Sequence, residues 1–134
     1  MAKTKHQESK LQRLAVSQFR YTWPEYAKLF FSVPNGGLRG QVEAGIMVGE
    51  GLMKGVSDTL LLVPSKGYHG LCIEFKKITY WYDNKGKEHY RKSGQEPEQR
   101  EWQALVEAQG YKYAIAYDIE SFWKIIEDYL GKRY

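Results

Sequence analysis

The spacing of apolar side chains along the chain predicts three helices. In residues 7–19 these side chains recur every three or four positions, so they share one face of a helix. That face holds Leu11, Leu14, Ala15, Gln18 and Phe19. A second helix is predicted over residues 97–109, because Pro97 suits a first turn and Gly110 suits the position after the last turn. The inner face of this second helix holds Trp102, Leu105, Val106 and Gln109. A third helix is predicted over residues 119–130.

Short apolar runs bounded by turn residues predict the strands. The runs are residues 28–33, 58–63, 70–77 and 111–117. Residues 78–82 and 87–91 are predicted to form a β-hairpin around a turn at residues 83–86, and the glycine-rich residues 38–57 a short helix with loops. The order αβ, then ββ, then αβα predicts a mixed α/β sandwich and not a regular alternation of parallel units.

Length and composition narrow the class of protein. The 134 residues are enough for one domain with a buried core, and we expect a single domain over residues 1–134. No apolar run approaches the roughly 20 residues of a membrane span, and the polar residues 1–10 contain no signal-peptide stretch. A single cysteine, Cys72, excludes an internal disulfide and a multi-cysteine zinc site. We therefore expect a cytoplasmic protein that needs no membrane.

The net charge of +4 is concentrated in one segment. Residues 76–92 contain six bases and two acids, so they carry a net +4 and the rest of the chain is neutral. The same segment contains Tyr80, Trp81, Tyr82 and Tyr90. Clustered bases and rings favour a polyanionic partner.

Two strands are predicted to bring acidic and basic side chains together. If residues 58–63 and 70–77 pair antiparallel around a turn near residue 66, opposed residue numbers sum to about 132. Asp58 then faces Glu74 at ~5 Å between Cβ atoms, and Lys76 lies on the same strand face as Glu74. Adjacent carboxylates repel unless a cation neutralises them, and oxygen ligands suit Mg²⁺ or Mn²⁺. A plain salt-bridge cluster is the alternative interpretation.

Two polar side chains continue the apolar faces of their helices. Glu8 precedes Leu11 by three positions, and Gln99 precedes Trp102 by three. Either residue suits a helix cap or the rim of the core, or it reaches the cluster of Asp58, Glu74 and Lys76.

Five short motifs follow one another along the chain. They are Glu8-Ser9-x-Leu11-Gln12, Pro34-Asn35-Gly36-Gly37-x-Arg39, Gly55-Val56-Ser57-Asp58, His69-Gly70-Leu71-x-Ile73-Glu74-Phe75-Lys76 and Glu98-Gln99-x-x-Trp102. Their order resembles that of the VRR-NUC domain, a branch of the PD-(D/E)xK nuclease superfamily. The resemblance covers residues 8–130, almost the whole chain. It implies a restriction-endonuclease-like α/β fold, with a mixed sheet flanked by helices (an αβββαβα-type core) and an inserted β-hairpin.

The resemblance also implies roles for individual residues. Asp58, Glu74 and the backbone carbonyl of Phe75 would bind Mg²⁺ or Mn²⁺, and Glu8 would contact this metal site directly or through water. Lys76 would position or activate the attacking water. Gln99 would touch the site from its helix, and the glycines at 36 and 37 would allow a close backbone approach.

Arg39 would hold a phosphate or form a structural salt bridge.

One departure from the family pattern is the 22 residues, 77–98, between Lys76 and Gln99, where the family has a short connection. This insertion is expected to grip nucleic acid, to extend the sheet edge, or to form a dimer contact. With Arg39, the expected nucleic-acid-binding bases are Lys77, Lys85, Lys87, Arg91 and Lys92.

The first functional hypothesis is a metal-dependent DNA endonuclease that hydrolyses phosphodiester bonds. The family's likeness to Holliday-junction resolvases and to phage enzymes implies branched DNA, a homodimer that matches the two-fold symmetry of a junction, and a bacterial or phage-infected cell. The alternatives are a non-catalytic nucleic-acid-binding domain with the same fold, and a nuclease that acts on RNA or on simple DNA ends.

Overall fold

The computed structural model describes residues 2–34 and 40–133, and for residues 2–6 it describes the backbone alone. The helices are α1 (Ala2–Thr22), the 3₁₀ helix η1 (Pro24–Leu29), α2 (Gln41–Gly49), α3 (Pro97–Ala108) and α4 (Ile119–Leu130). The strands are β1 (Phe30–Ser32), β2 (Thr59–Leu61), β3 (Leu71–Phe75), β4 (Ile78–Tyr82), β5 (Glu88–Lys92) and β6 (Lys112–Ala116). Each predicted element is present, although α1 is longer than the predicted helix and the first predicted strand begins as η1.

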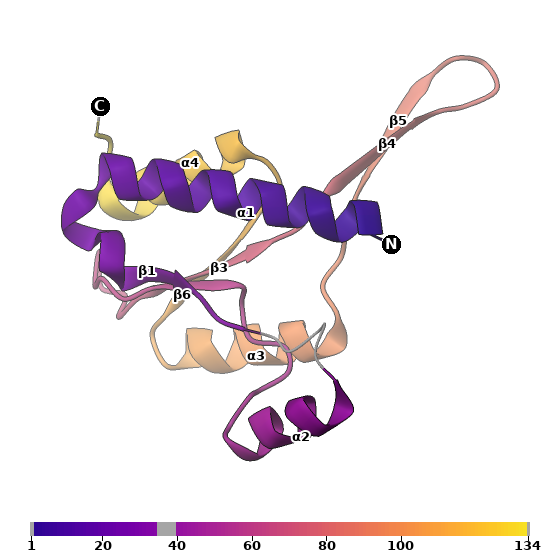
Figure 1. Cartoon of the computed structure of the whole chain (residues 1–134). Coiled ribbons are helices and arrows are strands. Elements are labelled where there is room, and N and C mark those ends of the chain that lie inside the picture. The colour runs from indigo at the N-terminus through magenta and orange to yellow at the C-terminus, as the bar shows by residue number, and fades with distance from the viewer. Residues whose placement is uncertain (1, 35–39, 134) are drawn as a thin grey trace.

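The main sheet is mixed, with strand order β1-β2-β3-β6. Strands β1, β2 and β3 are antiparallel neighbours, and β6 pairs parallel to β3 after the crossover through α3. This confirms the expected restriction-endonuclease-like αβββαβα core. The hairpin of β4 and β5 forms a separate two-stranded sheet and projects from the body near the beginning of α1 (Figure 1).

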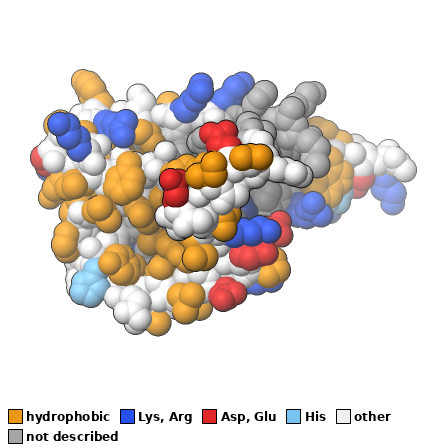
Figure 2. Space-filling model, turned by 60° about the horizontal axis from the view of Figure 1, so that its bottom comes forward, with side chains coloured by type: hydrophobic (Ala, Val, Ile, Leu, Met, Phe, Trp, Pro, Cys, Tyr) orange, Lys and Arg blue, Asp and Glu red, His pale blue; other side chains and the backbone are white. Residues whose placement is uncertain are grey.

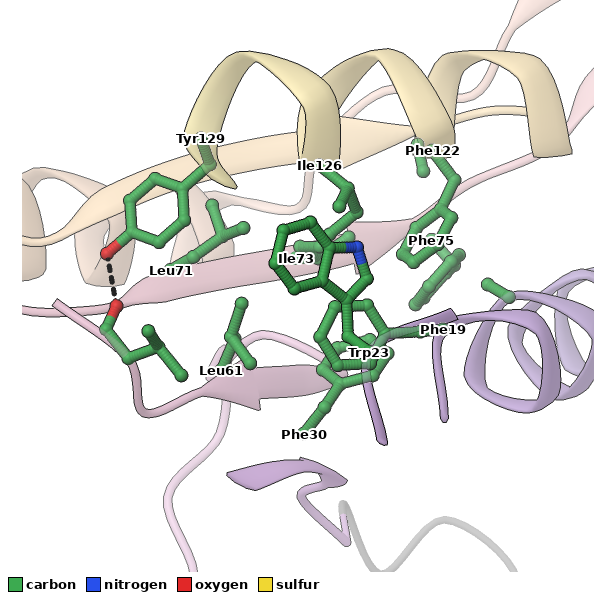
Figure 3. Close-up of a cluster of buried hydrophobic side chains, with 13 residues drawn as sticks. Phe19, Trp23, Phe30, Leu61, Leu71, Ile73, Phe75, Phe122, Ile126 and Tyr129 are labelled. Atoms are coloured by element: carbon green, nitrogen blue, oxygen red, sulfur yellow. Dashed lines mark hydrogen bonds between the residues drawn. The ribbon is translucent and has the colours of Figure 1, made fainter. Parts of the chain in front are cut away.

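The two faces of the main sheet have different environments. Alternate residues of β3, among them Ile73, point to the face covered by α1 and α4, where the hydrophobic core lies. Figure 3 shows this core, with rings from α1, β1, β3 and α4 in contact. Its largest buried side chains are Phe19, Phe30, Leu61, Leu71, Ile73, Phe75, Phe122 and Ile126. The remaining residues of β3, including Glu74, point to the face on the α3 side.

For two helices, the prediction of which side chains are buried was partly wrong. In α1, Ala15 and Phe19 are buried, whereas Leu14 and Gln18 are exposed. In α3, Leu105 and Gln109 are exposed, while Trp102 and Val106 are half-buried. Each helix rests on the sheet through a narrow stripe at spacing i, i+4, and the positions at i+3 turn toward solvent.

No helix within the described ranges is both long and apolar enough to cross a membrane.

Candidate active site

The antiparallel register of β2 and β3 brings two carboxylates together. Thr59 lies opposite Ile73, so the next pair toward the sheet end is Asp58 opposite Glu74, as predicted. The Asp58 Oδ2 atom accepts a hydrogen bond of 2.7 Å from the backbone N–H of Phe75. This contact fixes the carboxylate of Asp58 at the end of β3.

Gln99 joins the acidic and basic members of the cluster. Its Nε2 donates to Glu74 Oε2 at 2.9 Å, and its Oε1 accepts from Lys76 Nζ at 2.9 Å. Both partners are deeply buried, with exposed fractions of 3% for Glu74 and 9% for Lys76. The amide of Gln99 therefore holds the Glu74 carboxyl and the Lys76 ammonium at fixed positions on one side of the sheet.

Gln99 is also part of the cap of α3. The backbone N–H of Glu96 donates to Gln99 Oε1 at 2.8 Å, and the two residues form a reciprocal capping box. The sequence left a cap and a site contact as alternatives, and the structure contains both contacts. The start of α3 is thereby tied directly to the buried cluster.

Gly55 explains how α3 comes this close. A Cβ atom at this position would lie 2.5 Å from the backbone oxygen of Glu98, and its φ of +92° is one that other residues rarely adopt. The loop before Asp58 thus packs against the first turn of α3, one residue before Gln99.

Glu8 reaches the same cluster from α1. Its side chain is half-buried, and burial is the main cause that raises its pKa. The charges of Lys76 and Asp58 act on Glu8 in opposite directions, the first lowering and the second raising its pKa. The structure therefore assembles Glu8, Asp58, Glu74, Lys76 and Gln99 around the end of β3.

Burial makes both central carboxyl groups hard to ionise. Burial is the largest cause that raises the pKa of Asp58 and the pKa of Glu74. At Glu74 the charge of Asp58 is the second cause, and the pKa of Glu74 rises to about 8. The Phe75 N–H and the Lys76 ammonium counteract the shift at Asp58. The interaction between the two carboxyl groups lowers the pKa of Asp58 and raises that of Glu74.

This donor set fits a hard divalent cation. A buried and a half-buried carboxylate beside one lysine are short of positive charge, and Mg²⁺ is typically bound by one or two carboxylates together with several waters. Within the described part of the chain, no group of three or more His, Cys, Asp and Glu side chains is arranged to hold a metal ion. The protein side chains thus offer two ligands, Asp58 and Glu74, and the backbone of Phe75, the last residue of β3, contacts Asp58.

The sequence did not predict one contact of Glu74, with Tyr113, or the contact of Gln95 that supports it. The Tyr113 hydroxyl in β6 donates to Glu74 Oε1 at 3.3 Å, and Gln95 Nε2 donates to the Tyr113 hydroxyl at 3.2 Å. Tyr113 reaches Glu74 because β6 lies parallel beside β3. A parallel partner across a long crossover leaves no local signal in the sequence.

The predicted binding residues of the hairpin lie away from the cluster. Lys85, Lys87 and Arg91 are exposed on the hairpin, and the Lys92 Nζ lies 4.9 Å from the centre of the Tyr117 ring. Lys77 is half-buried between β3 and β4. Arg39 and the glycines at 36 and 37 lie outside the described residues.

The comparisons with known proteins bear on the fold. No family model and no curated protein matches the sequence. A solved structure described as a "VRR_NUC domain protein" superposes with a TM-score of 0.70 over 92% of this chain and 87% of that one. The chain has a VRR_NUC-type fold. The sequence identity is 21%, so the likeness is one of fold, and the VRR_NUC-type fold agrees with the order of motifs in the sequence.

The raised pKa of Glu74 predicts how stability depends on pH without metal. The unfolded chain ionises Glu74 near its ordinary pKa of 4.5, whereas the folded protein keeps the proton up to about pH 8. The free energy of unfolding should therefore fall as pH rises from 4.5 to 8, by ~1–3 kcal/mol from this group. Urea unfolding in EDTA across this range measures the slope.

Glu74→Gln should flatten that slope and stabilise the metal-free protein at pH 8, because a neutral amide can still donate to Asp58 and accept from Gln99. Glu101→Gln is the matched control, since Glu101 is exposed on α3 and loses the same charge. An equal slope in the wild-type and Glu74→Gln proteins would contradict the assigned proton.

Proposed function

We propose that this protein is a metal-dependent nuclease that hydrolyses phosphodiester bonds in DNA. The observation that carries the proposal is the pair of the half-buried Asp58 and the buried Glu74, with Glu74 linked to Lys76 through the amide of Gln99. A nucleic-acid-binding domain gains nothing from withdrawing two carboxylates from solvent, because desolvated negative charge is costly and repels phosphate. The VRR_NUC-type fold supports the same conclusion.

In this proposal the residues of the cluster have separate roles. Asp58, Glu74 and the carbonyl of Phe75 hold Mg²⁺ or Mn²⁺, and Glu8 acts on the site through water. The metal, when bound, supplies positive charge to the scissile phosphate. Lys76 positions the attacking water and offsets the charge that develops on the phosphate oxygens, while Gln99 holds Lys76 and Glu74 in place.

The water oxygen attacks phosphorus, the bond from phosphorus to the leaving oxygen breaks, the attacking water gives up a proton to solvent or to a nearby base, and the leaving oxygen takes up a proton from solvent to become a hydroxyl group. Since the ammonium of Lys76 is already held by Gln99 before substrate arrives, its position needs little reorganisation during the reaction.

The proposed substrate is branched DNA, and the proposed assembly is a homodimer. The exposed bases of the hairpin support contact with phosphates. Hydrophobic side chains gather on the face of the molecule seen in Figure 2, where α2 and α3 come forward, and this face supports contact with a second copy. The exposed apolar residues of these two helices include Val42, Ile46, Val48 and Leu105.

A cleavage panel tests the function. The full-length protein is incubated with a four-way junction, a flap, a splayed arm and a plain duplex, each with Mg²⁺, Mn²⁺ or EDTA. We expect cleavage of a branched substrate with either metal and none in EDTA. Tight binding without cleavage under all conditions would support the non-catalytic alternative, and cleavage of an RNA control alone would correct the substrate.

Sedimentation equilibrium of the same sample tests the assembly. A particle of 15.6 kDa that cuts junctions at full rate would exclude the homodimer.

A further inference from the structure

The hairpin of β4 and β5 has two chemically different faces. In its register Tyr80 lies opposite Tyr90, and Tyr82 lies opposite Glu88, so all four side chains share one face. The opposite face holds Trp81 beside its cross-strand partner His89. We call the first the tyrosine face, defined by Tyr80, Tyr82 and Tyr90.

The tyrosine face is open to solvent. The exposed fractions are 59% for Tyr80, 69% for Tyr82 and 65% for Tyr90, although rings of this size are normally at least half buried. The rings of Tyr80 and Tyr90 pack against each other with centres 6.3 Å apart. They form a fixed aromatic platform that no other part of the described chain covers.

A groove borders both the candidate active site and this platform, because Lys76 and Tyr80 are both in its lining. It has a volume of about 300 Å³ and lies between the first half of α1 and the base of the hairpin. Tyr117, between β6 and α4, also lines it. Lys92, which lies over the Tyr117 ring, adds a positive charge beside this groove.

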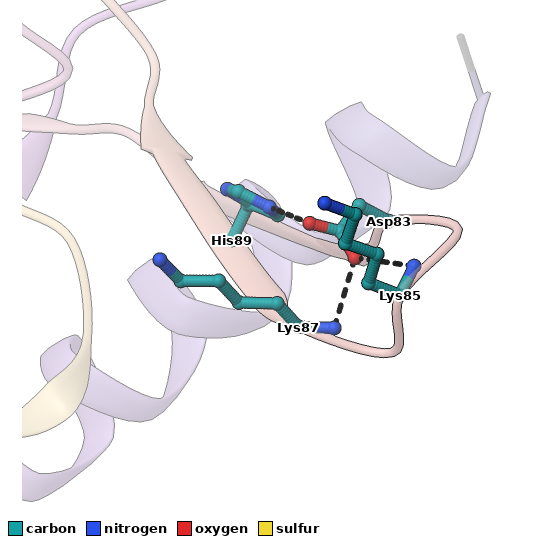
Figure 4. Close-up of polar contacts among 4 residues, drawn as sticks. All are labelled: Asp83, Lys85, Lys87 and His89. Carbon is teal, nitrogen blue, oxygen red and sulfur yellow. Dashed lines mark hydrogen bonds and ion pairs between the residues drawn. The ribbon is translucent and has the colours of Figure 1, made fainter.

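The tip of the hairpin is rigid, so the platform is pre-formed. Asp83 Oδ1 accepts hydrogen bonds of 2.9 Å from the backbone N–H groups of Lys85 and Lys87, and Asp83 Oδ2 pairs with His89 Nε2 at 2.7 Å. Figure 4 shows these contacts converging on the carboxylate of Asp83. Little conformational entropy is therefore lost when a ligand binds.

We infer that the tyrosine face and the groove bind unpaired nucleotides of the strand that leaves the active site. Nucleobases stack on tyrosine rings irrespective of sequence, and the basic side chains beside the groove neutralise the phosphate backbone. Paired nucleobases in a duplex have no free face to offer the rings. The inference rests on the proposed nuclease function and narrows its substrate to DNA with a single-stranded arm beside the cleaved bond.

The charge of the hairpin favours nucleic acid over a second copy of the chain as the occupant. Residues 76–92 carry the whole net charge of +4, so two tyrosine faces brought together would also bring two such segments together. A single DNA strand has the complementary charge and the flat apolar faces that the rings require.

The test compares two sets of hairpin variants by fluorescence anisotropy in EDTA, where cleavage does not interfere. The probes are an oligo(dT) strand of roughly 16 nucleotides, a plain duplex, and a duplex with an oligo(dT) arm. The double variant Tyr80→Leu/Tyr90→Leu removes the platform and keeps every charge. The triple variant Lys85→Ser/Lys87→Ser/Arg91→Ser removes charge and keeps the platform, and Trp81→Leu removes a ring from the opposite face.

We expect the tyrosine variant to bind the single strand and the armed duplex about tenfold or more weakly, with its affinity for plain duplex reduced by less than about threefold. Its slope of log K against log salt should not change. The triple variant should instead lower that slope by about 0.9 on duplex for each phosphate that it no longer binds. Trp81→Leu should affect single-strand binding less than the tyrosine variant.

The inference is overturned if the wild-type protein does not bind the single strand, or if the tyrosine variant loses affinity equally for all three probes. It is also overturned if that loss coincides with a dimer-to-monomer change in sedimentation, because the rings would then serve assembly. A protein that binds as expected but cuts nothing in the cleavage panel refutes the nuclease proposal and leaves the strand-binding surface standing.

Discussion

Glu74→Gln and Asp58→Asn are each expected to lower the cleavage rate by at least ~10²-fold, the scale of one electrostatic contribution to the transition state. Each substitution removes one of the two paired carboxylates and retains the shape of the side chain, so the site loses metal affinity while the sheet keeps its packing. Single-turnover cleavage of the best substrate of the panel, over a range of Mn²⁺ concentrations, measures the decrease.

The control for unfolding comes from the same substitution. Glu74→Gln is expected to be more stable than the wild-type protein at pH 8 without metal. In the wild-type protein, burial holds the pKa of Glu74 above its value in the unfolded chain, and this difference lowers stability at pH 8. The amide does not ionise and has no such cost. An inactive variant that is also more stable cannot owe its inactivity to unfolding. Full activity in Glu74→Gln or Asp58→Asn would refute the assignment of the carboxylates.

Lys76→Met is expected to lower kcat by at least ~10²-fold and to change DNA affinity much less. The apolar stem of Met replaces that of Lys76, but the site loses the ammonium that Gln99 orients. Quenched-flow cleavage at saturating DNA gives kcat, and anisotropy in EDTA gives the affinity.

Lys28→Met is the matched control for this lysine. Lys28 is exposed near the end of η1. It precedes Phe30, which forms the end of β1 that is farther from Asp58. If Lys76→Met weakened binding and left kcat intact, Lys76 would be a phosphate anchor and not part of the chemistry.

The sequence was most informative where the relevant contacts are local. The pairing of Asp58 with Glu74 follows from a short turn and an antiparallel register, and the structure has that register. The hairpin of residues 78–92 was equally predictable, because its turn contains Gly86 with a positive φ and an Asp83 that accepts from the turn's backbone. The fold class, which the order of motifs also implied, is confirmed by the mixed sheet and by the structural likeness.

The sequence was less informative where distant segments meet. Helical periodicity could not decide that Leu14 and Leu105 are exposed, because the angle at which a helix crosses the sheet selects its buried stripe. Tyr113 was missed because its contact with Glu74 spans a parallel crossover. The roles assigned to the site residues all stay predictions: Asp58, Glu74, Phe75, Lys76, Glu8, Gln99 and Arg39.

The chain enters and leaves the hairpin at almost the same point, since the N–H of Ser93 donates to the carbonyl of Lys77 at 3.0 Å. Strands β4 and β5, which lie between these two residues, pair only with each other in the described structure. The length or sequence of the hairpin can therefore vary without moving Gln99 relative to Glu74. Proteins of this fold could therefore exchange this arm for a plain turn or a different one in a single event, while the cluster around the end of β3 is inherited intact.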